Sequence, residues 1–167
     1  MDQDAVLAGR AAAGDAAAFT ALVRAHEGAV RRFLARLTRG DGADDLAQEA
    51  FLRAWRRAGD YRGAGSYRGW LMRIAWTAFL DARKSAGRRE DREMAVLQQE
   101  SPRNPDAAID LGRALAGLGT RERAAALLCF GEGCSHAEAA QIMGLPLGTL
   151  KSILARARAA LVARLEA

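Results

Sequence analysis

Residues 135–161, SHAEAAQIMGLPLGTLKSILARARAAL, indicate the fold of this 167-residue chain more clearly than any other stretch. Ser135, with Glu138 three residues later, has the pattern of a capping box, in which two side chains satisfy free backbone N–H groups at a helix start. Gly144 ends that short helix, and Leu145-Pro146 turns the chain into a longer one. Apolar residues recur at helical spacing on one side of the longer helix: Leu150, Leu154, Ala157, Leu161 and Leu165. The stretch therefore predicts a helix-turn-helix.

The second helix of such a motif inserts its N-terminal residues into the major groove of DNA. Short polar and basic side chains there can reach phosphates and base edges. The candidates on the second helix are Gly148, Thr149, Lys151, Ser152, Arg156 and Arg158, and Ser135 at the start of the first helix is a further candidate. An ordinary antiparallel helix hairpin has the same spacing, but the basic outer face of the last helix favours DNA.

Charge is distributed unevenly along the chain, whose net charge is +5 and whose pI is about 10.0. Basic residues outnumber acidic ones in residues 61–92 and 149–167, whereas residues 93–110 are acidic. Solvated helix faces explain a single basic block, but two separated blocks favour a polyanion held at two places. No apolar run reaches the ~18–20 residues of a membrane span, and the N-terminus lacks a signal-peptide pattern, so we expect a cytoplasmic protein.

Helix signals recur along the chain, and strand signals are absent from the sequence. We expect a helix capped by Asp15, a second one after Gly28, and further helices over residues 43–58 and from Ser66 or a neighbour to near Lys84. A helix from a Thr120 cap is expected to carry the apolar residues Ala125, Leu127, Leu128 and Phe130. The acidic stretch from Glu93 to Asp106 carries Pro102 and Pro105 and is typical of a linker. The predicted fold is all-α, with two small helical domains (residues 1–92 and 108–167) joined by a flexible acidic linker (residues 93–107).

Three segments together resemble one known family. ADDLAQEAFLRAWR (43–56), YRGWLMRIAWTAFLDARK (67–84) and the helix-turn-helix above are similar, in order and spacing, to segments of the extracytoplasmic-function (ECF) sigma factors of bacterial RNA polymerase. The similarity extends from about Phe19 to Leu165. It implies a protein that binds core RNA polymerase, directs it to promoters and promotes DNA melting. The N-terminal domain would read the minus-ten element, the C-terminal domain the minus-thirty-five element, and the linker would thread near the RNA path.

The resemblance also implies partners and a location. The partners are core RNA polymerase, promoter DNA and an anti-sigma factor, and the free protein is expected to be a monomer. No catalytic activity, cofactor, metal or small-molecule substrate is expected. The protein would lie in the cytoplasm, on the nucleoid when in holoenzyme, or at the membrane when an anti-sigma factor holds it there.

One face of the 43–56 helix is expected to dock on the polymerase. Leu52 lies on this otherwise polar stripe, and an apolar residue among charges suits a protein interface. The resemblance assigns core-polymerase binding to Asp44, Asp45, Gln48, Glu49, Leu52, Arg53 and Arg56. Trp55 is expected to pack in the core.

The 67–84 helix and the glycine-bearing loop before it are expected to hold the minus-ten strand. Arginine and lysine pin phosphates, and aromatic rings stack on unpaired bases. The family's loop and helix capture a flipped base, and the residues implied are Tyr61, Arg62, Ser66, Tyr67, Arg68, Trp70, Arg73, Thr77, Asp81 and Lys84. Trp76 is expected in the core with Met72 and Phe79.

The chain departs from the family pattern at three places. Thr77 stands where the family often has Asn, Ile153 where it usually has Arg, and Leu118-Gly119 where it has Leu-Pro. Ile153 implies either a missing DNA contact or a helix that faces apolar protein. Two other functions stay open: a stand-alone helix-turn-helix regulator, and a sigma mimic that sequesters an anti-sigma factor.

Catalytic and metal motifs are not evident in the sequence. It has no phosphate-binding Gly-Lys motif and no HExxH. Cys129, Cys134 and His136 are too few for a structural zinc site, which normally has four ligands.

Overall fold

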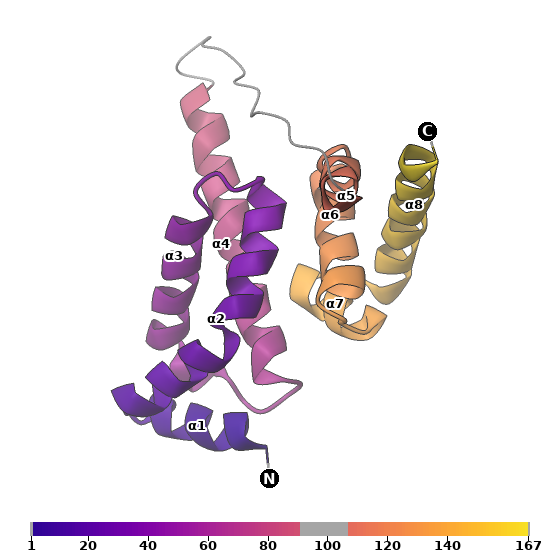
Figure 1. Cartoon of the computed structure of the whole chain (residues 1–167). Coiled ribbons are helices and arrows are strands. Elements are labelled where there is room, and N and C mark those ends of the chain that lie inside the picture. Colours follow the sequence, from indigo (N-terminus) through magenta and orange to yellow (C-terminus); the bar gives the residue numbers. More distant parts are fainter. Residues whose placement is uncertain (1, 91–106, 167) are drawn as a thin grey trace.

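The computed structural model describes residues 2–90 and 107–166, and every regular element within these ranges is helical (Figure 1). The N-terminal half contains α1 (Gln3–Ala12), α2 (Ala16–Thr38), α3 (Ala43–Arg56), a 3₁₀ turn (Ala58–Asp60) and α4 (Tyr67–Glu90). The C-terminal half contains α5 (Ala107–Ala116), α6 (Thr120–Ala126), a π-helical turn (Leu127–Gly131), α7 (His136–Met143) and α8 (Leu147–Leu165). The all-α prediction is confirmed. Within the described ranges, no helix is both long and apolar enough to cross a membrane.

The N-terminal half is a bundle of α2, α3 and α4, with α1 lying across one end (Figure 1). Phe33 and Leu34 of α2 and Leu71 and Met72 of α4 are buried in its centre. The buried face of α3 is made of alanines, Ala47, Ala50 and Ala54. Small side chains on a helix let neighbouring helices approach closely, so α3 packs against the other two through these alanines, with Leu46, Phe51 and Trp55 partly buried beside them.

Two predictions for the N-terminal half were incomplete or wrong. Gly28 does not separate two helices, because α2 continues through it from Ala16 to Thr38. A single glycine costs a helix only about 1 kcal/mol relative to alanine, and the apolar stripe on both sides of Gly28 outweighs that cost. The sequence also gave no prediction for α1, which buries Ala8 and Ala11. Asp15 caps α2 as expected: its carboxylate accepts the N–H groups of Ala17 (3.0 Å) and Ala18 (3.1 Å).

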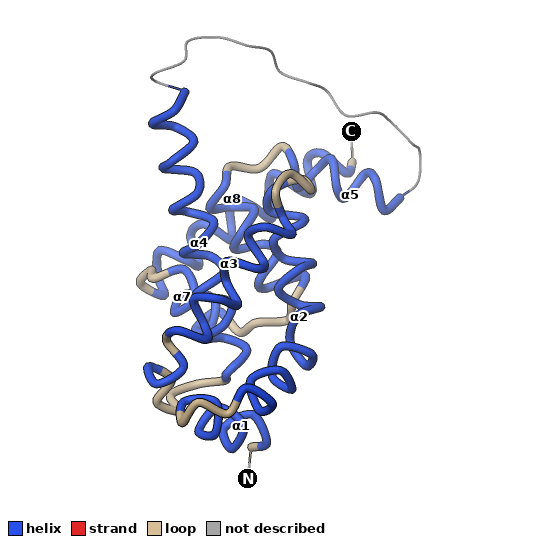
Figure 2. Tube along the Cα trace, turned by 90° about the vertical axis from the view of Figure 1, so that its left-hand side faces the viewer, coloured by secondary structure: helices blue, strands red, loops and turns tan. Residues whose placement is uncertain are grey.

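The C-terminal half packs against the N-terminal bundle as well as within itself. Its own small cluster joins Ala114 and Leu118 to Ala157 and Leu161 of α8. The remaining buried residues of this half, such as Leu128 and Leu150, belong to the same hydrophobic cluster as the core of the N-terminal bundle. Figures 1 and 2 show α5–α8 standing alongside the N-terminal helices. The two halves therefore share one core.

Arg123 of α6 is buried at the junction of the two halves. Its guanidinium donates to the carbonyl oxygens of Leu115 (2.9 Å), Ala116 (2.8 Å) and Leu118 (2.9 Å). It also donates to the carbonyl of Leu37, at the end of α2 in the other half (3.1 Å). Burial lowers the pKa of this guanidinium. The side chain thus donates to carbonyl oxygens at or just after the C-terminal ends of α5 and α2, where helix carbonyls lack their usual i+4 partners.

Three details of the C-terminal half differ from expectation. Thr120 does not cap α6; it is the first helical residue, and Gly119 precedes it as cap, with its N–H donated to Glu122 (3.2 Å). Phe130, expected in the apolar stripe, is 57% exposed, and Leu165 is also exposed. The π-helical turn at Leu127–Gly131 explains the first exposure, because its wider winding rotates Phe130 away from the core. Leu165 lies in the last turn of α8, beyond the helices that cover Leu161.

The expected linker, residues 93–107, lies outside the described residues except for Ala107, which begins α5. The domain limits at residues 92 and 108 therefore remain a prediction.

Candidate functional site

The outer face of α3 carries the residues that the sequence assigned to a protein interface. Asp45, Gln48, Leu52 and Arg56 are exposed on it, and Leu52 is 50% exposed despite being apolar. An apolar groove of about 490 Å³ runs beside this face, between the start of α2 and α3. Its lining residues are Ala16, Phe19, Thr20, Gln48, Phe51, Leu52 and Trp55. The α3 face is therefore half of a two-helix surface.

Sequence reasoning missed the contribution of α2 to this groove. The ring of Phe19 packs against that of Trp55, with centroids 5.0 Å apart, and both rings are only partly buried. Trp55 was expected to pack in the core, and it does so on one side while lining the groove on the other. The sequence does place Phe19 on the apolar stripe of the helix that Asp15 caps. Periodicity alone, however, does not distinguish a residue that lines a groove from one that lies in the core.

The other predicted residues of α3 are engaged in ion pairs. Arg53 donates to Glu49 (2.7 Å) and to Asp81 of α4 (2.7 Å), and its pKa is raised, chiefly by the bond to Glu49 and then by that to Asp81. Asp44 accepts from Arg31 of α2 (2.6 Å). These pairs brace α3 against its neighbours, so Asp45, Gln48, Leu52 and Arg56 form the open part of the face.

The loop before α4 is ordered by aromatic packing. The rings of Tyr61, Tyr67 and Trp70 contact one another, with centroid distances between 5.2 and 5.8 Å. Tyr61 donates its hydroxyl to the Gly65 carbonyl across the loop (3.0 Å). Ser66 caps α4, as expected, by accepting the N–H of Gly69 (3.0 Å). The cluster gives the loop a defined shape beside the exposed Arg62.

Tyr67 occupies a different place from the one expected of a DNA contact. Its side chain is 2% exposed, and burial raises the pKa of its phenol to about 12. The helical periodicity of α4 turns this position toward the core, where Tyr67 supports Tyr61 and Trp70 from beneath. We therefore correct the prediction and place Tyr67 among the core residues.

The expected polar stripe of α4 lies on the surface. Arg73, Thr77, Asp81 and Lys84 are exposed, and Trp70 is partly exposed. Thr77 donates its hydroxyl to the Arg73 carbonyl within the helix (2.9 Å), which leaves its oxygen as an acceptor. Trp76 is buried with Met72 and Phe79, as predicted.

The helix-turn-helix has the local geometry that its sequence predicts. Ser135 accepts the N–H of Glu138 (3.2 Å), and Glu138 accepts the N–H of Ser135 (2.8 Å), so the capping box is complete. The Ser135 bond lowers the pKa of Glu138. Gly144 ends α7 with φ of 65°, a left-handed conformation that glycine adopts without strain. The turn thus fixes the direction in which α8 leaves.

The first turns of α8 present the predicted DNA-contacting residues to solvent. Exposed residues there are Gly148, Thr149, Lys151 and Ser152, followed by Arg156 and Arg158. Arg156 also donates to Glu122 of α6 (3.3 Å). Ile153 is buried, so the structure selects the alternative in which this position faces apolar protein.

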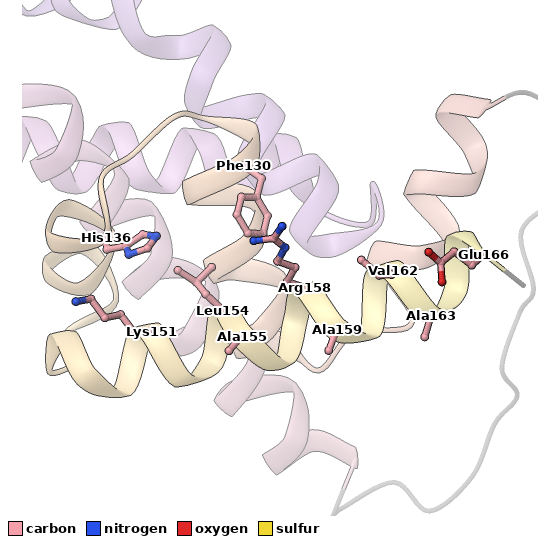
Figure 3. Close-up of a pocket in the computed structure, with 10 residues that line it drawn as sticks. All are labelled: Phe130, His136, Lys151, Leu154, Ala155, Arg158, Ala159, Val162, Ala163 and Glu166. Carbon is pink, nitrogen blue, oxygen red and sulfur yellow. The ribbon is translucent and has the colours of Figure 1, made fainter.

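A second apolar groove of about 710 Å³ follows the outer face of α8 (Figure 3). Phe130 forms one wall, Leu154 and Val162 lie along the floor, and Lys151 stands near one end with Glu166 at the other. Phe130 was expected in the apolar stripe of the helix that follows Thr120, so sequence reasoning did not find this groove. Two basic residues expected to contact DNA, Lys151 and Arg158, also line it.

Metal-binding geometry is not evident in the described part of the chain, where no group of three or more His, Cys, Asp or Glu side chains converges. Cys129 and Cys134 are partly buried free thiols. Burial raises the pKa of Cys129 to about 11, so this thiol is protonated at neutral pH.

Comparisons with known proteins match both halves. The family model described as sigma-70 region 2 matches residues 22–89, and that described as sigma-70 region 4 matches residues 108–161. The chain is 36% identical over 173 residues to the ECF RNA polymerase sigma factor SigC of Mycobacterium tuberculosis, covering 99% of this chain and 94% of the relative. It is 39% identical over 162 residues to the ECF RNA polymerase sigma factor SigM of the same species, and the match covers 95% of this chain and 82% of the relative.

Solved structures give the same result. The sigma factor RpoE in complex with the anti-sigma factor NepR, from Bartonella quintana, superposes with a TM-score of 0.80 at 27% identity, covering 89% of this chain and 96% of that one. CnrH in complex with the cytosolic domain of CnrY superposes with a TM-score of 0.73 at 28% identity, and the match covers 99% of this chain and 98% of CnrH.

Proposed function

The chain belongs to the extracytoplasmic-function sigma factors, and we propose that its two halves share the work of this family across three surfaces. Sigma factors are transcription initiation factors that join core RNA polymerase and direct it to promoters. In our proposal the N-terminal half docks on the polymerase and reads the minus-ten element, and the C-terminal half reads the minus-thirty-five element. We expect no catalytic activity of its own.

The open α3 face and the adjoining α2–α3 groove are the proposed polymerase dock. The observation that carries this assignment is Leu52, an exposed apolar residue between charged neighbours and at the edge of an apolar groove. Monomeric proteins rarely expose such a combination without a partner, and interfaces typically bury an apolar centre within a polar rim. Asp45, Gln48 and Arg56 would form that rim. Asp44, Glu49 and Arg53 would hold α3 in place through their ion pairs.

The loop at residues 61–66 and the stripe on α4 are the proposed minus-ten surface. Trp70 offers an aromatic ring, and Arg62, Arg68, Arg73 and Lys84 offer positive charge for phosphates. Thr77, Ser66 and Tyr61 supply hydroxyl groups. Melting would then be driven by binding of the separated strand, since extrusion of a base costs a few kcal/mol that new contacts must offset.

The first turns of α8 are the proposed minus-thirty-five surface. Thr149, Lys151 and Ser152 are exposed at the position from which a recognition helix reads the major groove. Ser135, Gly148, Arg156 and Arg158 are proposed to contact the backbone of the same site. The buried Ile153 takes no part.

An anti-sigma factor is the further partner that we propose, because both structural neighbours are solved in complex with proteins of that kind or with a cytosolic domain. The α8 groove, apolar along its floor, with Lys151 near one end and Glu166 at the other, fits an amphipathic helix that has an acidic residue at the Lys151 end. We expect the free protein to be a cytoplasmic monomer that reaches the nucleoid in holoenzyme.

The polymerase dock is tested by capturing purified core RNA polymerase with the wild type and with Leu52→Asp. We expect the substitution to weaken capture at least about tenfold, because a carboxylate at an apolar contact must be desolvated without a partner. Val6→Asp is the matched control, since Val6 is also an exposed apolar residue but lies on α1 outside the groove. If Leu52→Asp and Val6→Asp are captured equally, the dock lies elsewhere. Promoter-dependent run-off transcription with the captured enzyme then separates a sigma factor from a stand-alone regulator or a mimic.

A further inference from the structure

Helix α1 contacts the elements on both sides of the loop that we assign to minus-ten DNA. It packs on α2, on the 3₁₀ turn Ala58–Asp60 and on α4. Figure 1 shows α1 across the lower end of the bundle, where the chain turns from α3 into α4. The 3₁₀ turn leads into the loop at residues 61–66, and α4 follows it. None of the three proposed surfaces includes α1, although it adjoins one of them.

One hydrogen bond between side chains joins α1 to α2 near this loop. The Nε2 atom of His26 lies 2.8 Å from the Oδ2 atom of Asp4, and the His26 side chain is only 12% exposed. A carboxylate oxygen can only accept, so the ring nitrogen carries the hydrogen and donates it. Because the His26 ring is largely shielded from water, solvent screens this contact less than the exposed Arg10–Asp15 pair elsewhere on α1.

The other side of the His26 ring contacts the aromatic cluster formed by Tyr61, Tyr67 and Trp70. The centroids of the His26 and Tyr67 rings are 5.8 Å apart. Tyr67 in turn lies 5.2 Å from Tyr61 and 5.3 Å from Trp70, centroid to centroid. Tyr67 is almost fully buried, so it does not move without displacing its neighbours. A continuous line of contacts thus runs from Asp4 on α1 to the rings of the loop.

The start of α1 also lies close to the two tyrosines of the cluster. Asp2 caps the helix by accepting the N–H of Asp4 (3.2 Å). Burial raises the pKa of Tyr61, and the negative charges of Asp2 and Asp4 raise it further. The charge of Asp4 adds in the same way to the effect of burial on the pKa of Tyr67. The N-terminal turn of α1 is therefore an immediate neighbour of the aromatic cluster.

We propose that α1, through the hydrogen bond between Asp4 and His26, holds the aromatic cluster in the shape that receives an unpaired base. Asp4 and His26 are then positioning residues, which act on DNA only through the rings that His26 supports. A loop whose shape is fixed before the base arrives loses less conformational entropy on binding it, so more binding energy remains to offset the cost of base extrusion. This inference rests on the proposed minus-ten surface.

Four variants of the full-length chain test this role. Asp4→Ala removes the acceptor, whereas Asp4→Asn removes the charge but keeps an acceptor oxygen. Arg10→Ala is the matched control, because it breaks a different ion pair of α1, the one with Asp15. Trp70→Ala is the positive control, because it removes a ring of the aromatic cluster itself. Circular dichroism checks that each variant is folded.

The first measurement is a two-dimensional proton–nitrogen NMR spectrum of the free protein, in which each of the three tryptophan indole groups gives one peak. The peaks of Trp70 and Trp76 are assigned by their loss in Trp70→Ala and Trp76→Phe. We expect the Trp70 peak to shift in Asp4→Ala and to stay in place in Asp4→Asn and Arg10→Ala. The peak of Trp76, which is buried in the core, should stay in place in all three. An unmoved Trp70 peak in Asp4→Ala would overturn the proposal.

The second measurement is run-off transcription by the holoenzyme on one promoter in two forms, fully paired and with a preformed bubble at the minus-ten element. We expect Asp4→Ala to reduce run-off about fivefold on the paired form and less than about twofold on the bubble, where the strands are already separated. Asp4→Asn and Arg10→Ala should stay within about twofold of the wild type on both forms. Loss of the negative charge of Asp4 by itself favours DNA binding, so electrostatics does not explain a loss.

The positive control separates failure of this inference from failure of the proposed surface. Trp70→Ala should show the same pattern as Asp4→Ala, with a larger loss on the paired promoter. If Trp70→Ala loses no activity there, the proposed minus-ten surface is wrong and the role of α1 falls with it. If Trp70→Ala loses activity and Asp4→Ala does not, or if Asp4→Ala loses as much on the bubble as on the paired form, the role of α1 alone is wrong.

Discussion

The N-terminal half buries large side chains between three long helices, whereas the private cluster of the C-terminal half consists of three alanines and two leucines. Helices α6 and α7 are short, with 7 and 8 residues, and too little apolar surface is available to make a second full core. Leu127, Leu128 and Ile142 accordingly join the hydrophobic cluster of the N-terminal bundle. The N-terminal half therefore has a hydrophobic core of its own, whereas the C-terminal half is stabilised largely by packing against that core.

This difference also applies to the two proposed DNA surfaces. The recognition residues at the start of α8 face solvent, so nothing in the same chain has to move before they meet DNA. The proposed minus-ten surface faces α7 across a narrow cleft. Packing of α7 on α4, which stabilises the C-terminal half, thus involves the proposed minus-ten surface of the N-terminal half.

Replacing the buried arginine at the junction should have the largest effect on stability. Arg123→Met keeps the length and apolar stem of the side chain but leaves the carbonyl oxygens of Leu37 and Leu118 without the guanidinium donor, whereas those of Leu115 and Ala116 keep a second donor. Leaving buried polar groups unsatisfied should lower the free energy of unfolding by about 3 kcal/mol, measured by urea titration. Arg121→Met on the exposed side of α6 is the control and should change it by less than about 0.5 kcal/mol. Equal curves for the two variants would show that the junction contributes little to stability.

The same comparison explains which parts of the structure were predictable from sequence. The capping box at Ser135 and the cap at Asp15 are local and are present as predicted, and Ser66 lies at the start of α4, where a helix start was expected. Arg123 contacts Leu37, 86 positions away in the sequence, and Glu132 contacts Arg68, 64 positions away. No local sequence pattern predicts such long-range contacts. The helices could therefore be predicted from the sequence, but the core that the two halves share could not.

The sites show the same division. The exposed stripes on α3, α4 and α8 follow from helical periodicity, and the structure has them. The groove walls at Phe19 and Phe130 could not be predicted, because one depends on how α2 packs on α3 and the other on a π-helical turn. Helix α1 was missed because its buried positions are alanines, which give a weak hydrophobic signal.

Two glycines in and just after α1 of the N-terminal half are expected to have a smaller effect on the free energy of unfolding when replaced. Gly9 lies inside α1 with open space where a Cβ would be, and Gly14 follows the helix with φ of 92°. We expect Gly9→Ala to raise the free energy of unfolding by roughly 0.5–1 kcal/mol, since alanine has the higher helix propensity and restricts the unfolded chain. Gly14→Ala should lower it by about 1 kcal/mol, because an L-residue is strained at that φ. Both are measured by thermal and urea unfolding. If Gly9→Ala has no effect, α1 does not unfold together with the bundle.

The smallest expected effect concerns acid sensitivity, because in each half one carboxylate among the described residues has its pKa lowered by a backbone N–H at a helix start. The pKa of Asp15 is lowered, chiefly by the N–H of Ala18 and next by Arg10, and that of Glu138 is lowered by the N–H of Ser135. A carboxylate with a lowered pKa stabilises the fold fully above its unfolded-state pKa, about 3.9 for Asp. That contribution is lost as the pH falls through the folded-state pKa.

Asp15→Asn isolates this contribution in the N-terminal half. Asparagine is as good a helix cap as aspartate, and the ion pair with Arg10 is exposed, so stability at pH 7 should be almost unchanged. Below about pH 4 the wild type should lose stability more steeply than the variant, because only the wild type takes up a proton at this position. Urea titrations between pH 7 and pH 2.5 measure the difference. Glu138, present in both proteins, supplies a common background, so parallel pH profiles for wild type and variant would mean that the charge of Asp15 does not help to hold α2 in the fold.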